Sequence, residues 1–499
     1  TGTELFAGVV EESLRVGIEV APFVDAFSRK AARSIAAGIV GSDPEKTVLD
    51  TETAGVIALR QGLDIVVGGN IRRDGSKLVM SVTAVSPRDQ KELFSVTETA
   101  AGETEILEAV SMIANRMRKA LGYTDGRSGE GARESFAVAN REAGSEYLKA
   151  QDLQLDRRLE EARVHYQKAI DLDPGFARAY AGLAITEQYL GNTDAATANW
   201  NEVLPRLDTL TERGQLRTLA NYYMINQRNY PQALATYEEL IARFPGDNVA
   251  HNNLAVTAFY ALDFERALEV GRVVAKRFPD HSGYSANLAL FAMYASRFDE
   301  ASEVARRVIE MDSSNVYALT VMSLTYASSG QVGDAEQIYR RMLDLDQYGE
   351  SIAYEGLADL AMSRGDDVSA LDLLETAIEI ERARGSLHSV ALKNAMRAEA
   401  LLRLGEKEAA LRATEDALEF ASSDAAVLVP AAKVLVDLDW ADRAETIAAE
   451  LANSVSRSDR AYAALIRAHI SESKDDLGKA VEQVEAALVV ADIWLARMM

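Results

Sequence analysis

The sequence contains no cysteine. Disulfide bonds, thiolate zinc sites and catalysis by a cysteine nucleophile are therefore excluded, although this absence does not assign a cellular compartment. No run of 18 apolar residues occurs within the 499 residues, so no transmembrane helix is expected inside this chain. The chain opens at Thr1 without a signal-peptide pattern, so we expect any membrane anchor to lie in a segment outside it.

Basic residues are scarce compared with acidic ones. The chain holds 53 Lys and Arg against 77 Asp and Glu, which gives a net charge of −24. Residues 1–122 contain 17 acidic and 14 basic side chains, a net charge of −3, so the remaining chain carries −21. Such a surface repels phosphate groups, so we expect no nucleic-acid partner. The charge has two interpretations, an acidic recognition surface or a means of keeping a long molecule soluble.

Motifs that carry catalysis or bind cofactors are also missing. There is no P-loop, Rossmann glycine signature, zinc-protease helix, EF-hand loop or kinase catalytic loop. The pair Gly68-Gly69 lies within a predicted strand, where a bulge or close packing is the usual reason for glycine. The histidines show no paired ligand spacing: His165, His251, His281, His388 and His469. We therefore expect no cofactor, no metal and no catalytic residues in this chain.

A repeat with a period of thirty-four residues dominates the second part of the sequence. The stretch "NLAVTAFYALDFERALEV" (253–270) returns as "NLALFAMYASRFDEASEV" (287–304). This period is that of paired helices that stack on identical neighbours. A small residue recurs where each second helix should cross its partner: Ala162, Ala196, Ala233, Ala267, Ala301, Ala335, Ala370, Ala410, Ala444 and Ala480. Pro174, Pro245 and Pro279 fall at the predicted turns between units, where proline ends a helix without losing a needed N–H.

The spacing drifts at 204–214 and at 381–389, and both places are interpreted as longer connections between units. The last residues, "DIWLARMM" (492–499), have the pattern of the opening of another helix. With these features, residues 143–499 resemble the tetratricopeptide family. The resemblance implies a mainly α fold, a right-handed solenoid of about ten helical hairpins, whose first helices line a concave face.

The first 122 residues follow a different pattern. A polar start and a glycine stop predict a helix at 50–62. An Asp74-Gly75 turn joins two strands, and Leu78, Met80, Val82 and Ala84 alternate on one face of the second strand. The remaining elements are expected at these ranges: strands at 63–73, 77–86 and 91–100, and an amphipathic helix at 104–122.

The stretch Leu14–Phe23 is interpreted as a further strand. On the residues "ALRQGLDIVVGGNIRRDGSKLVMSVTAV", followed by the closing helix that ends "KALG", the unit at 1–122 resembles the TolB-like α/β domain. That family begins with a strand upstream of its first helix, which this chain lacks, so the sheet is expected to lack an edge or to borrow one. Residues 123–142 are a linker by composition.

A candidate ligand site follows from the resemblance, because asparagines on first helices of such arrays often bond the backbone of an extended peptide. Asn253 and Asn287 occupy this position, and Asn252 lies beside the first. Aromatic residues accompany them: Tyr189, Tyr260 and Tyr294 at one repeat position, with Tyr222 and Phe259 nearby. Tyrosine and asparagine suit a hydrated, adaptable interface. The alternative is that these residues only fill gaps and satisfy neighbouring backbone groups in the array.

Two functions are weighed. The pairing of a TolB-like unit with a long array resembles the extracytoplasmic sensor region of bacterial membrane-bound serine/threonine kinases and some cyclases. This implies a catalytic domain and a membrane helix upstream of Thr1, and a protein or peptide ligand in the groove. The alternative is a free-standing periplasmic or lipid-anchored assembly scaffold. A homo-oligomer and a cytoplasmic location both stay open.

Overall fold

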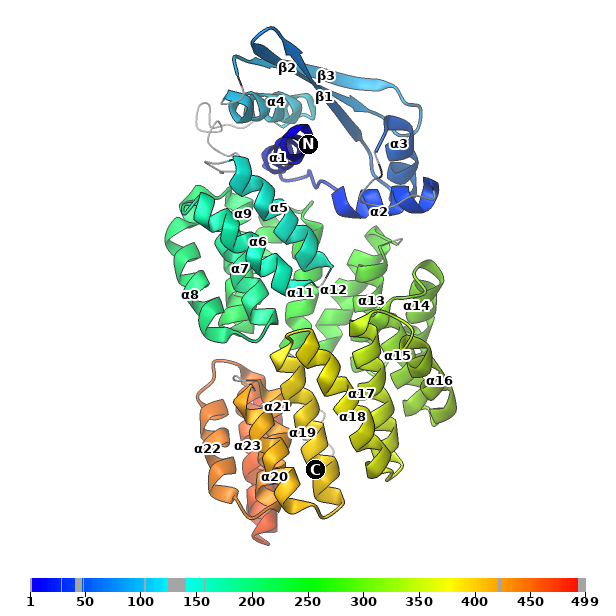
Figure 1. The fold of residues 1–499 in the computed structure, drawn as a ribbon, viewed down its shortest axis with the longest axis vertical. Helices are drawn as coiled ribbons and strands as arrows, with labels where there is room; N and C mark the ends of the chain where they lie inside the picture. The colour runs from blue at the N-terminus through cyan, green and yellow to red at the C-terminus, as the bar shows by residue number, and fades with distance from the viewer. Residues whose placement is uncertain are drawn as a thin grey trace.

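The structure is a computed structural model that describes residues 2–27, 29–40, 47, 49–102, 105–123, 141–156, 158–279, 281–420 and 424–491. Most of the predicted linker at 123–142 and the predicted helix opening at 492–499 lie outside these residues. The described part consists of a small α/β domain and a long row of paired helices (Figure 1).

The N-terminal sheet is an antiparallel meander in the order β1-β2-β3. Its strands are β1 (Val66–Asp74), β2 (Lys77–Val85) and β3 (Glu92–Ala100). Gly75 has a φ of 61°, the left-handed conformation that the tight turn after β1 requires. The predicted hairpin and the three-strand order are thus confirmed.

Two helices cover one face of this sheet, α1 (Gly2–Ile18) and α4 (Ile106–Ala120). Leu78, Met80, Val82 and Ala84 are buried, as the alternation in this strand predicts. The opposite face carries exposed pairs of hydroxyl groups, for example Ser81 opposite Thr97 at 3.0 Å. Two more helices, α2 (Arg29–Val40) and α3 (Thr51–Arg60), lie beside β1.

The predicted strand at Leu14–Phe23 is wrong. Residues 14–18 form the end of α1, and residues 19–23 form turns that lead into residues 24–27, which have no regular secondary structure. The alternation of apolar residues at Leu14, Val16 and Ile18 suggested a strand. The helix buries two sides, however, because Leu14 and Ile18 pack towards the sheet while Val16 packs towards the helical array.

In the part of the array that the structure describes, twenty helices form ten hairpins, which confirms the predicted number. Their bounds are α5 (Arg141–Leu155), α6 (Leu159–Leu172), α7 (Ala177–Tyr189), α8 (Thr193–Val203), α9 (Glu212–Asn221), α10 (Tyr230–Arg243), α11 (Asn248–Tyr260), α12 (Phe264–Arg277), α13 (Ser282–Tyr294), α14 (Phe298–Met311), α15 (Val316–Ser328), α16 (Val332–Met342), α17 (Gln347–Ser363), α18 (Asp367–Ala383), α19 (Leu387–Arg403), α20 (Lys407–Glu419), α21 (Ala425–Asp437), α22 (Ala441–Ala452), α23 (Arg457–Ser473) and α24 (Leu477–Val490). Each predicted crossing alanine lies on a second helix, and all but Ala480 are completely buried.

The two predicted long connections have different outcomes. Between α8 and α9 the chain forms a 3-10 helix (Leu204–Thr209), so this connection is longer, as predicted. The prediction at 381–389 is wrong, because only residues 384–386 separate α18 from α19. The extra residues instead lengthen α17, α18 and α19, each of which has 17 residues.

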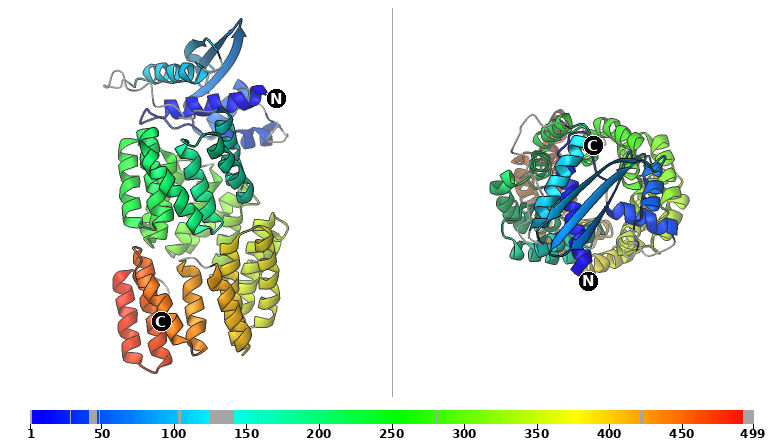
Figure 2. Two further views of the ribbon diagram at one scale, coloured as in Figure 1. Left: turned by 60° about the vertical axis from the view of Figure 1, so that its left-hand side comes forward. Right: turned by 90° about the horizontal axis from the view of Figure 1, so that it is seen from above.

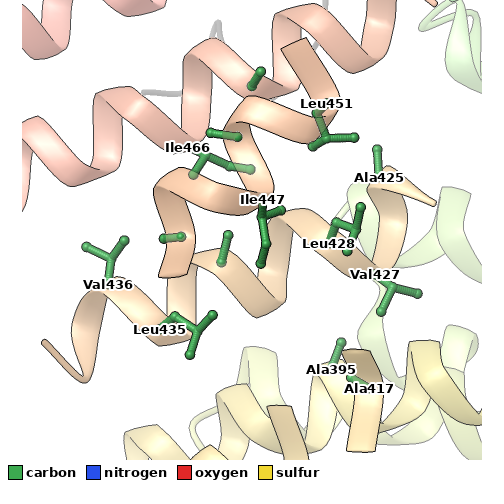
Figure 3. Packing of buried hydrophobic residues seen from close by; sticks show 14 of the residues in the cluster. Ala395, Ala417, Ala425, Val427, Leu428, Leu435, Val436, Ile447, Leu451 and Ile466 are labelled. Carbon is green, nitrogen blue, oxygen red and sulfur yellow. The ribbon is translucent and has the colours of Figure 1, made fainter. Parts of the chain in front are cut away.

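The hydrophobic core is distributed along the array instead of being gathered at one centre. A cluster near the C-terminus shows the arrangement: Val427, Leu428, Ile447 and Ile466 interdigitate between neighbouring hairpins, with Ala395 of the preceding unit beside them (Figure 3). Small residues let the helices approach, and larger ones fill the space between units. Each hairpin therefore depends on its neighbours for burial of its apolar faces.

The array curves into a superhelix. Viewed from above, its helices form a ring, and α1 and the sheet lie across the end of this ring (Figure 2). The hairpins from α5 to α13 lie between the N-terminal domain on one side and the hairpins from α17 to α24 on the other (Figures 1 and 2). Both edges of this middle layer are therefore covered, one by the N-terminal domain and the other by the C-terminal hairpins.

Candidate functional site

The three predicted asparagines lie together in one hydrogen-bonded row on α11 and α13. Asn287 Nδ2 donates to Asn252 Oδ1 at 3.0 Å, and Asn252 Nδ2 donates to Asn253 Oδ1 at 3.3 Å. Asn253 Nδ2 in turn donates to the hydroxyl of Tyr237 at 3.2 Å, and that hydroxyl donates to Asn221 Oδ1 at 2.5 Å. All three predicted amides are half-buried. We call these five residues the amide row.

Part of the hydrogen-bonding capacity of these amides is unused by the contacts above. An asparagine side chain has two N–H donors and an oxygen with two lone pairs. Within the row, Asn252 and Asn253 each donate one hydrogen bond and accept one, and Asn287 donates one. The row can therefore serve the array internally and still offer polar groups to a ligand.

The predicted aromatic residues beside the row form a packed group. Phe259 lies 4.9 Å from Tyr294 and 5.8 Å from Tyr260 between ring centroids, in edge-to-face geometry. Tyr260 also stacks on Tyr230 at 6.2 Å. Phe259 is half-buried, whereas Tyr260 and Tyr294 keep 52% and 46% of their surface exposed. The two tyrosines are thus anchored on one side and accessible on the other.

The other two predicted residues lie apart from this group. Tyr189 is 46% exposed at the end of α7, the same position that Tyr260 and Tyr294 occupy at the ends of α11 and α13. Tyr222 begins a π-helical turn (Tyr222–Asn226) after α9 and packs on the buried Trp200 at 5.6 Å. Tyr222 therefore has a packing role in addition to any contact with a ligand.

A contact surface between distant hairpins, which the sequence did not reveal, lies next to these tyrosines. Arg228, after the turn that follows α9, pairs with Asp459 at the start of α23 at 3.1 Å. Leu262, just after α11, packs against the cluster of Ala461, Leu465 and Ala487. His388 at the start of α19 lies against Gly191, because a Cβ on this glycine would be 3.4 Å from the backbone nitrogen of His388. We call this contact the seam, because it joins the second to fourth hairpins to the eighth and tenth.

A second contact surface missed by the sequence joins the array to the N-terminal domain. Arg213 at the start of α9 is 3% exposed and binds both Asp247 of the array and Asp25 of the N-terminal domain. No spacing or composition in the sequence marks these residues as partners. Arg213 and Asp247 lie one repeat apart, whereas Asp25 reaches them because the N-terminal domain packs on the array.

A small recess of about 290 Å³ opens between the first helices α21 and α23. Its walls are apolar, with charged groups at the rim, and its lining consists of Val429, Lys433, Val436, Leu465, Ile466, His469 and Glu472. Lys433 is exposed at this rim. The recess is large enough for one apolar side chain, and a lysine beside it suits a ligand that also carries negative charge.

The histidines form separate polar pairs that do not make a catalytic set. His165 lies 2.5 Å from Glu146, His388 lies 3.1 Å from Asp424, and His469 lies 2.9 Å from Asp437. In the part of the chain that the structure describes, no group of three metal-ligating side chains converges. Within the same ranges, every helix is too short or too polar to cross a lipid bilayer.

Comparison with known proteins agrees with this architecture. Residues 219–282, 287–350 and 321–386 match the family model of the tetratricopeptide repeat. These segments therefore contain tetratricopeptide repeats, as the period of the sequence predicts for them. Proteins that contain these repeats are typically non-catalytic scaffolds that bind proteins or peptides. No curated protein matches the chain.

Several solved structures are similar in fold. The crystal structure of yeast Tom70 is 14% identical, covers 77% of this chain and 91% of that chain, and has a TM-score of 0.43. The human IFIT1 dimer with m7Gppp-AAAA is 15% identical, with 70% and 83% coverage and a TM-score of 0.41. A tetratricopeptide repeat protein from Parabacteroides merdae is 15% identical, with 60% and 100% coverage and a TM-score of 0.37.

Proposed function

We propose that this chain is a non-catalytic module that binds a protein or an extended peptide on the inner surface of its array. The observation that carries this proposal is the amide row beside the exposed tyrosines of α11 and α13. Amide groups with unused hydrogen-bond donors and acceptors suit the backbone of an extended segment. Accessible tyrosine rings add contact area, and few rotatable side-chain bonds have to be immobilised when they bind. The apolar recess between α21 and α23 supports the proposal by offering a place for one anchoring side chain.

The cellular role that we propose is that of a sensor in a bacterial signalling receptor. On this proposal the array faces the extracytoplasmic side, captures its ligand there and is tethered through a segment upstream of Thr1. The helix, meander and helix of the N-terminal domain support the TolB-like assignment, and its contact with the array offers a path by which ligand capture changes the orientation of the domain. A free-standing assembly scaffold is the second candidate.

Two observations separate these candidates. A coding sequence with a kinase or cyclase domain and a membrane helix before Thr1 favours the receptor. Co-purification of stoichiometric partner proteins, with neither element upstream, favours the scaffold.

The binding surface is tested with peptides selected against the full chain from a random library displayed on phage. We expect the double variant Asn252→Ala/Asn287→Ala to bind such a peptide roughly thirtyfold more weakly, because each of the two lost hydrogen bonds costs about 1 kcal/mol. Asn453→Ala is the matched control, since its side chain bonds only the backbone of its own second helix, at Ala449. Unchanged affinity in the double variant for every selected peptide would show that the amide row is structural.

A further inference from the structure

The segment after α1 is held by the array in the manner of a bound peptide. Arg213 Nη1 donates to the carbonyl oxygen of Glu19 at 3.1 Å and to that of Val24 at 2.7 Å. The backbone N–H of Gly246 donates to the carbonyl oxygen of Pro22 at 3.2 Å. Three carbonyl groups of the segment Glu19–Asp25 are therefore satisfied by two residues of the array.

The side chain of Asp25 is recognised as well. Its Oδ1 accepts a hydrogen bond from Arg213 Nη2 at 2.7 Å, and its Oδ2 accepts one from Asn248 Nδ2 at 2.5 Å. Charge-assisted contacts of this kind are among the stronger hydrogen bonds in proteins. One guanidinium group thus donates hydrogen bonds to two backbone carbonyls and one carboxylate at the same time.

The array holds these donors in place through Asp247. This carboxylate is fully buried, accepts from Arg213 Nε at 2.8 Å and from Arg217 at 2.6 Å, and caps α11 through the N–H of Ala250. The orientation of Arg213 is thus fixed by an array residue that the segment does not supply. Pre-organised donors lower the free-energy cost of binding a peptide segment.

The segment contributes little apolar burial of its own. Phe23, its largest side chain, is 53% exposed, although Ala21 is completely buried. Gly246 lets the segment approach, because a Cβ at that position would lie only 3.0 Å from the carbonyl carbon of Phe23. Recognition therefore depends mainly on main-chain carbonyls, one carboxylate and close backbone contact.

We propose that Arg213, Gly246 and Asn248 form a recognition site for an aspartate-bearing peptide that is folded in turns, and that the segment Glu19–Asp25 occupies it as a ligand from the same chain. This inference goes beyond the proposed function, because the site lies at the start of α11 whereas Tyr260 lies at its end. A peptide of the same chemistry that displaces the segment would leave the N-terminal domain attached to the array through α1 and Lys30.

The test uses a labelled synthetic peptide with the sequence of residues 17–27, GIEVAPFVDAF, and the full chain. Asp25→Lys places a second cation against Arg213, so it should release the segment and leave the site vacant. We expect the peptide to bind this variant at least roughly tenfold more tightly than it binds the wild-type chain, whose own segment competes. Adding Gly246→Leu to Asp25→Lys should abolish this binding, because the leucine side chain fills the space of the segment backbone.

Gly175→Leu, combined with Asp25→Lys, is the matched control. Gly175 follows a proline at an equivalent turn, but its only near neighbour is the side chain of Asp173. Peptide binding should survive this substitution. The proposal is overturned if Asp25→Lys fails to bind the peptide, or if Gly246→Leu and Gly175→Leu have equal effects. Circular dichroism checks that the array stays helical, and Asp25→Ser replaces Asp25→Lys if it does not.

Discussion

The attachment of the segment Glu19–Asp25 to the array should weaken as pH rises. Together with its neighbours, Asp25 belongs to a group of four carboxylates and three guanidinium groups: Glu12, Glu19, Asp25 and Asp247 with Arg15, Arg213 and Arg217. Burial and the charges of Glu19 and Asp247 raise the pKa of Asp25 from 3.8 to about 6, even though Arg213 partly opposes them. The attached state therefore binds a proton more tightly than the released state does.

The sign and size of the effect follow from linkage. Below pH 3.8 the carboxyl group is protonated in both states, and its titration costs the attached state nothing. Above that pH the free-energy cost of ionising Asp25 in the attached state grows, and it reaches its limit of about 3 kcal/mol above pH 6. Between pH 5 and pH 8 the cost rises by about 1.4 kcal/mol, which is about a tenfold loss of attachment. Glu19 and Asp247 have lowered pKa values, so both stay charged over this interval.

The absence of cysteine provides a direct assay. Ala21 is completely buried, so in an Ala21→Cys chain the single thiol reacts with an aromatic disulfide only when the segment opens. The labelling rate, divided by that of a synthetic peptide of the same sequence at each pH, should rise about tenfold from pH 5 to pH 8. In Asp25→Asn this rise should disappear. The same substitution also controls for the nearby His251 and His281, whose pKa values burial lowers. An undiminished rise in Asp25→Asn would refute the reasoning.

Two further predictions concern the array itself. Arg228→Met should leave the buried carboxylate of Asp459 unpaired and lower the free energy of unfolding by about 2 kcal/mol, and small-angle scattering should show a longer molecule as the seam opens. Arg272→Met, which removes an exposed ion pair between neighbouring hairpins, should change neither quantity measurably. Gly356→Ala should destabilise the chain by about 1–2 kcal/mol in urea, because its Cβ would overlap the buried ring of Tyr339. Gly333→Ala, with open space around it, should be neutral or stabilising; equal effects of the two alanines would contradict this account.

The candidate site shows where sequence-based prediction succeeds and where it stops. Asn253 and Asn287 were predicted from their shared repeat position, and Asn252 because it lies beside Asn253. The structure brings the three together because stacked units of equal length place these positions close to one another, although Asn287 bonds Asn252 and not its repeat equivalent. Their binding role stays a prediction. The partner of Asn253, Tyr237, was missed because it lies on a second helix, where a tyrosine has the pattern of ordinary core.

The error at Leu14–Phe23 has a related cause. Alternating apolar residues over a short stretch fit a strand and also a helix that is buried on two sides. The sequence pattern contained nothing to separate these cases, because the neighbours of α1, which are α4 with the sheet on one side and α5 on the other, are brought to it from distant parts of the chain.

The sequence by itself determined the hairpins, their number and the three-stranded meander, because these depend on contacts between residues close in the chain or one repeat apart. The crossing alanines, the turn prolines and the period of thirty-four carry that information locally. Tertiary structure alone decided that the array closes on itself through Arg228 and Asp459, and that Arg213 holds Asp25. These pairs are separated by 231 and 188 residues. The first pair meets through small rotations summed over several hairpins, and the second because the N-terminal domain packs on the array.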